Sequence, residues 1–85
     1  MITYRVFIAA EVITLLRSCP RREQQIFTRL FEELAKDPYR VGDYAERDEV
    51  GRPVQVLIVG GRAVYFWADH PVKEVKVVDL RPAGR

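Results

Sequence analysis

Two arginines flank the β-rich segments in the last third of the sequence. Arg62 follows a Gly-Gly pair and opens a run of β-branched and aromatic residues, and Arg81 closes a second such run. A hairpin of this kind carries two cationic side chains to the ends of neighbouring strands, where they could bind a phosphate group. An Asp-His-Pro corner between the runs holds His70, the only histidine. Histidine titrates near neutral pH, which suits proton transfer, although in such a turn it is more commonly an exposed surface residue. We predict Arg62, Arg81 and His70 as candidate catalytic residues.

Aromatic residues alternate with apolar ones in the first of these runs. Tyr65 and Trp67 must face one side of a strand, and Val64 and Phe66 the other. Burial under helices explains one pair, and we expect Phe66 in the core. The other pair could form an exposed surface for stacking on bases or docking a partner, with packing on both faces as the alternative.

The composition is that of one globular domain spanning residues 1–85. The chain is 48% apolar and 31% charged with a net charge of +2, which permits a nucleic-acid or acidic partner without requiring one. The single cysteine, Cys19, excludes an intramolecular disulfide, and we expect it to be buried. No segment has the length of a membrane span and no secretory signal is visible, so we expect no membrane partner and a cytoplasmic location. No nucleotide-binding motif is present, and we predict neither a cofactor nor a metal.

Hydrophobic periodicity and turn residues predict an α+β fold. An N-terminal strand precedes a two-helix antiparallel hairpin, and a mainly antiparallel sheet of three to four strands follows. The helix signals are an apolar stripe from Ile26 to Leu34 in the second helix and a proline at each end of it. The predicted strands are 3–8, 54–59, 63–68 and 72–80, with a weaker one at 46–50, and the predicted helices are 9–19 and 20–36.

This element order, together with the Gly-Gly-Arg-Ala-Val-Tyr start and the Asp69 turn of the last hairpin, resembles the RelE/ParE superfamily. These proteins are the toxins of type II toxin–antitoxin pairs, and the resemblance covers nearly the whole chain. It includes the helical hairpin, the Lys36-Asp37-Pro38 helix exit and the valine-rich final strand.

The resemblance implies a phosphate site made of basic residues. Arg62 matches the family arginine at the start of the penultimate strand, and Arg81 lies at, or one residue from, the arginine after the final strand. Pro53 and Gln55 stand near the positions of the family's lysine pair, and the family's C-terminal tyrosine is absent. Other cations could compensate, so the predicted nucleic-acid-binding residues are Arg52, Arg62, Lys73, Lys76, Arg81 and Arg85.

Three functions follow from the resemblance; we predict the first, mRNA cleavage, and keep the other two as alternatives. The RelE branch implies a ribosome-dependent, metal-independent mRNA endoribonuclease, with ribosome-bound mRNA as its partner. The ParE branch implies inhibition of DNA gyrase by protein–protein contact. A degenerate member would retain antitoxin binding alone. All three imply a cognate antitoxin protein as a partner.

Overall fold

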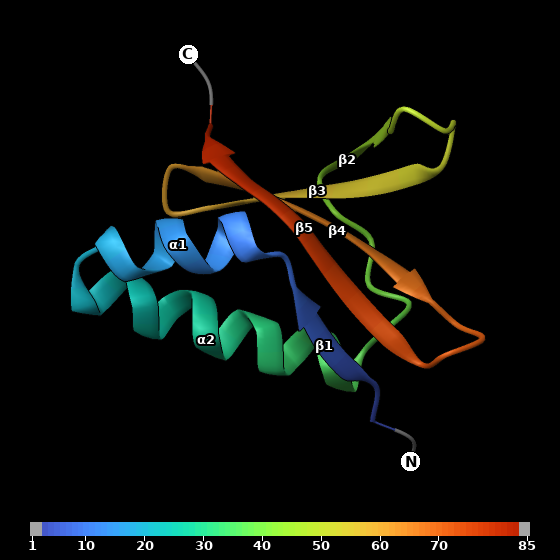
Figure 1. Cartoon of the computed structure of the whole chain (residues 1–85), viewed down its shortest axis with the longest axis horizontal. Helices are drawn as coiled ribbons and strands as arrows, with labels where there is room; N and C mark the ends of the chain where they lie inside the picture. Colours follow the sequence, from blue (N-terminus) through green and yellow to red (C-terminus); the bar gives the residue numbers. More distant parts are fainter. Residues whose placement is uncertain (1–2, 84–85) are drawn as a thin grey trace.

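A two-helix hairpin packs against one face of a five-stranded sheet in the computed structural model, which describes residues 3–83 (Figure 1). The elements in chain order are β1 (Arg5–Ile8), α1 (Ala10–Ser18), α2 (Arg21–Lys36), β2 (Tyr44–Arg47), β3 (Pro53–Val59), β4 (Arg62–Asp69) and β5 (Glu74–Pro82). The predicted α+β class and element order are confirmed. With β1 included, the sheet has slightly more strands than the three to four expected. Within residues 3–83, no helix is long and apolar enough to cross a membrane.

The strand order in the sheet is β1-β5-β4-β3-β2. β1 runs parallel to β5, and the other neighbours are antiparallel. Parallel neighbours need a long crossover connection, and the chain between β1 and β5 contains the helical hairpin and strands β2 to β4. Both helices pack on one face of the sheet, which we call the inner face (Figure 1). We call the opposite face, which neither helix covers, the outer face.

Tight turns set the strand boundaries. Gly60 and Gly61 both have positive φ angles, of 57° and 79°, which suits a two-residue hairpin between β3 and β4. The weak strand predicted at 46–50 instead spans Tyr44–Arg47. It ends there because the Asp48 carboxylate accepts hydrogen bonds from the backbone N–H groups of Val50 and Arg52, at 3.0 and 2.9 Å. Such a side-chain turn competes with strand pairing.

The core lies between the helices and the inner face of the sheet. Phe27, Leu30, Phe31 and Leu34 are buried on α2, as the apolar stripe predicted, and Cys19 is buried as expected. Ile26 is the exception: it is 42% exposed, because it lies at the margin of the stripe.

An irregularity in β5 decides which way its last residues point. The pairing of Tyr65 with Asp79 is followed by that of Phe66 with Val77, so β5 has one extra residue, Val78. A bulge of this kind shifts the alternation of side chains by one. Val77 and Leu80 are therefore both buried although they are three residues apart.

Candidate functional site

Arg62 lies on the helix side of the sheet. Its Nε donates a 3.0 Å hydrogen bond to Oε1 of Glu23, in the first turn of α2. Its cross-strand partner is Pro82, and Val64, two residues further along β4, belongs to the core under the helices. The side chain is 24% exposed and is held by one carboxylate. The Arg62–Glu23 ion pair joins the β3–β4 hairpin to α2.

Arg81 lies on the outer face. Its guanidinium carbon is 4.6 Å from the centre of the Tyr65 ring, and its Nε donates to Oδ2 of Asp79 at 2.7 Å. The hydrogen bond to Asp79, and next its charge, raises the pKa of the Arg81 guanidinium. Adjacent residues of a strand face opposite sides, and Ala63, not Arg62, is the partner of Arg81. The structure therefore does not bring Arg62 and Arg81 together.

A groove of about 600 Å³ surrounds Arg81 on the outer face. We call it the outer groove; it is lined by Arg47, Arg52, Arg81, Glu46, Asp48, Glu49, Asp79, Tyr65, Val50, Val54 and Val78. Its three arginines face four carboxylates, so its formal charge does not favour a phosphate.

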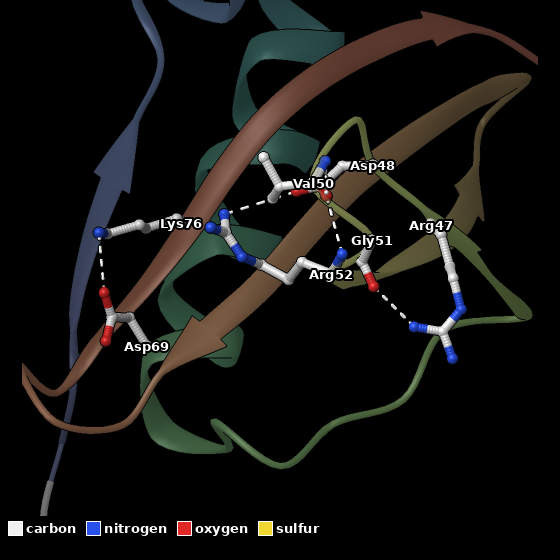
Figure 2. A network of polar contacts seen from close by, with 7 residues as sticks. All are labelled: Arg47, Asp48, Val50, Gly51, Arg52, Asp69 and Lys76. Atoms are coloured by element: carbon white, nitrogen blue, oxygen red, sulfur yellow. Dashed lines mark hydrogen bonds and ion pairs between the residues drawn. The ribbon is translucent and has the colours of Figure 1, made fainter.

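Arg52 and Lys76 meet over the indole ring of Trp67. The Arg52 guanidinium carbon lies 4.0 Å from the ring centre and Lys76 Nζ lies 5.1 Å from it. Each cation is also paired with a carboxylate, Arg52 with Asp48 at 3.5 Å and Lys76 with Asp69 at 2.9 Å (Figure 2). The expected burial of Phe66 is confirmed, together with that of Val64, whereas Tyr65 and Trp67 lie half-buried on the outer face under these cations and Arg81.

His70 lies at the opposite end of β4 from Arg62. At about 3.3 Å per strand residue, this separation is roughly 20 Å or more. The His70 Nδ1 is 2.8 Å from the Tyr4 hydroxyl, and its ring stacks on Tyr39. The neighbouring carboxylate, Asp69, accepts a hydrogen bond from Lys76 and does not orient His70.

The other two predicted cations are placed as follows. Lys73 is in the same turn as His70, and it has a positive φ of 56°, so β5 begins at Glu74 rather than Val72. Arg85 lies outside the described residues.

Two solved structures share the whole of this architecture. One is the archaeal RelE–RelB complex from Pyrococcus horikoshii OT3, of which a chain superposes with a TM-score of 0.82 at 23% identity, over 99% of this chain and 99% of that one. The other is the toxin–antitoxin complex RelBE2 from Mycobacterium tuberculosis, with a TM-score of 0.78 at 20% identity, over 100% of this chain and 97% of that one. The chain has a RelE-like fold. No protein-family model and no curated protein matches the sequence.

In this RelE-like fold the positions expected to hold the lysine pair carry no charge. Gln55 is paired with Phe66, so it faces the same side as Arg62, and its Oε1 accepts a 2.8 Å hydrogen bond from the backbone of Gly42. Pro53 is two residues away on the same side. Pro82, and not Arg81, lies opposite Arg62. Of the four positions Pro53, Gln55, Arg62 and Pro82, only Arg62 is cationic.

Several residues of the RelE-like outer face were not predicted. Asp48 and Asp79 bind Arg52 and Arg81, and Tyr44 lies beside Tyr65. Desolvation first, and then the neighbouring Tyr65, raises the pKa of the Tyr44 hydroxyl, which keeps it neutral. Both carboxylate–arginine pairs are local in sequence: Asp48 and Arg52 are four residues apart across the β2–β3 turn, and Asp79 and Arg81 are two residues apart on β5, so their spacing could have indicated them.

Proposed function

We propose that this chain is the toxin of a type II toxin–antitoxin pair, with a cognate antitoxin as its partner. The observation that carries the proposal is the near-complete match, in both directions, to chains of two solved complexes of this kind.

The antitoxin would bind across the helical hairpin and the neighbouring sheet edge. A groove of about 380 Å³ between α2 and β3 is lined by Ile26, Leu30, Leu57, Ile58, Val59 and three charged residues. Ile26 and Ile58 are 42% and 41% exposed there. β2 pairs only with Pro53–Val56 of β3, and beyond it the backbone N–H of Ile58 donates a 2.7 Å hydrogen bond to the Asp43 carboxylate, so an incoming strand would replace Asp43 to pair with Leu57–Val59. Helix docking combined with strand addition suits such a surface.

The toxin acts through protein contacts and not through RNA cleavage by Arg62 and Arg81. Metal-free cleavage requires several cations around one phosphate, pre-positioned where negative charge develops. Arg62 and Arg81 face opposite sides of the sheet, and each is bonded to a carboxylate. Inhibition of DNA gyrase, the activity of the ParE branch, is the proposed mode.

Ribosome-dependent mRNA cleavage is the second candidate. It is favoured by one observation: Arg81 and Arg52 lie over Tyr65 and Trp67 on the same face. Such cation–aromatic pairs are also found where proteins bind single strands. In this case Arg81, without Arg62, would contact the phosphate. Either activity would place the protein in the cytoplasm, with ribosomes and gyrase.

Expression of the chain alone should arrest bacterial growth, and co-expression of the protein encoded beside it should restore growth. Ile26→Glu should preserve arrest but weaken rescue, because a charge would enter the α2–β3 groove. Val72→Glu is the matched control, since Val72 is 48% exposed and lines neither that groove nor the outer groove. Normal growth with abundant folded protein would contradict the toxin assignment.

A further inference from the structure

A second pocket lies between the loop that follows α2 and the adjoining ends of β3 and β4. Its volume is about 450 Å³, which is within the range of small-ligand sites. We call it the loop pocket; the residues used below are Tyr39, Arg40, Arg52, Trp67 and His70. It shares Arg52 with the outer groove.

The charges of the loop pocket favour an anion. Arg40 and Arg52 line it, and no carboxylate does. Arg52 also contacts Asp48, at 3.5 Å, but that carboxylate lines the outer groove. Within residues 3–83, Arg40 has no carboxylate at salt-bridge distance. Arg40 also lines the α2–β3 groove, as Glu33 does, but it forms no ion pair there, so it can form a charge-assisted bond with a phosphate in the loop pocket.

A fixed aromatic platform lies beside these arginines. The Tyr39 and His70 rings are stacked, with centres 4.6 Å apart and planes 18° from parallel. Tyr4 meets the edge of His70 at 5.6 Å and its hydroxyl is 2.8 Å from Nδ1. Desolvation, followed by the nearby Tyr39, raises the pKa of the Tyr4 hydroxyl. Tyr39 itself is 74% exposed, which leaves ring surface for another planar group.

We propose that the loop pocket binds a nucleoside phosphate. The base stacks on Tyr39, the phosphate pairs with Arg40 and Arg52, and His70 supports the platform from behind. The ligand can be a free mononucleotide or one nucleotide of a single strand. An acidic peptide would satisfy the two arginines, but it would leave the planar platform unused, so the aromatic pair favours a base.

Fluorescence of Trp67 gives a direct test, since this residue is the only tryptophan and lines the pocket. The probes are 5′-AMP, a hexauridine RNA, ribose 5-phosphate and a hexaglutamate peptide, each added to the full chain. Isothermal calorimetry measures the same affinities independently. We expect saturable binding of 5′-AMP and of the RNA, and markedly weaker binding of ribose 5-phosphate and the peptide.

The variants separate stacking from charge. Tyr39→Ala should weaken binding of 5′-AMP about tenfold or more, because stacking is worth about 1–3 kcal/mol per base. Tyr39→Phe keeps the ring and should retain affinity. Arg40→Ala should weaken both phosphate probes, and Arg22→Ala, an exposed α2 control outside the pocket, should weaken neither.

Equal binding of ribose 5-phosphate and 5′-AMP would overturn the proposal, as would equal binding of the peptide or unchanged affinity in Tyr39→Ala. Absence of binding by both nucleotide probes would also overturn it. Tighter binding of the RNA than of 5′-AMP would identify a strand as the source, and equal binding would identify the free nucleotide.

Discussion

Replacing Phe27 with alanine should lower the free energy of unfolding by about 4 kcal/mol. Phe27 is 1% exposed and lies at the centre of the α2 stripe, beside Phe31, with ring centres 6.5 Å apart. Its removal takes away buried apolar area and leaves a cavity that two helices and a sheet cannot close. This loss is a large fraction of the stability of a domain of this size. Urea denaturation followed by circular dichroism measures it.

The adjacent Ile26 is the control for this prediction. Ile26 is 42% exposed, so Ile26→Ala should cost less than about 1 kcal/mol. Similar losses in the two variants would show that the packing of α2 on the sheet is not as described.

Gly42→Ala should cost about 3 kcal/mol, for a different reason. A Cβ at this position would lie 2.6 and 2.8 Å from the backbone C and N of Val56. These are backbone atoms of a paired strand, so they cannot move aside as a flexible side chain could. The loop would have to leave β3, with loss of the bonds from Gly42 to Gln55 and from Asp43 to Val56.

The same urea experiment tests Gly42→Ala, with Val41→Ala as its neighbour control. Val41 is 69% exposed, so that change should be close to neutral. An unchanged unfolding midpoint for Gly42→Ala would mean that the loop does not lie against β3.

Local patterns were enough to predict much of the fold. The alternation in β4 correctly separated Val64 and Phe66 from Tyr65 and Trp67, because side chains of a strand point to opposite faces in turn. The apolar stripe of α2 and the Gly-Gly hairpin were equally local signals. Each depends on residues within a few positions of one another.

The candidate site could not be predicted in the same way. The face on which Arg81 lies depends on the bulge at Val78, and the partner of Arg62 depends on the register between β4 and β5. Tyr4 meets His70 across 66 positions of sequence. Such long-range relations depend on the register of the whole sheet. The sequence pattern predicted Arg62 and Arg81 at the ends of neighbouring strands, but it could not show that they face opposite sides of the sheet.

Cleavage of mRNA on translating ribosomes, compared among the wild type, Arg62→Ala and Arg81→Ala, tests most directly whether the protein acts without an Arg62–Arg81 site. A gyrase supercoiling assay on the same preparations accompanies it. Cleavage lost only in Arg81→Ala would support the second candidate, with the outer groove as its site. The proposed function predicts inhibited supercoiling and no cleavage above the protein-free control, even for the wild type. Wild-type cleavage that falls about a hundredfold or more in each arginine variant would contradict it.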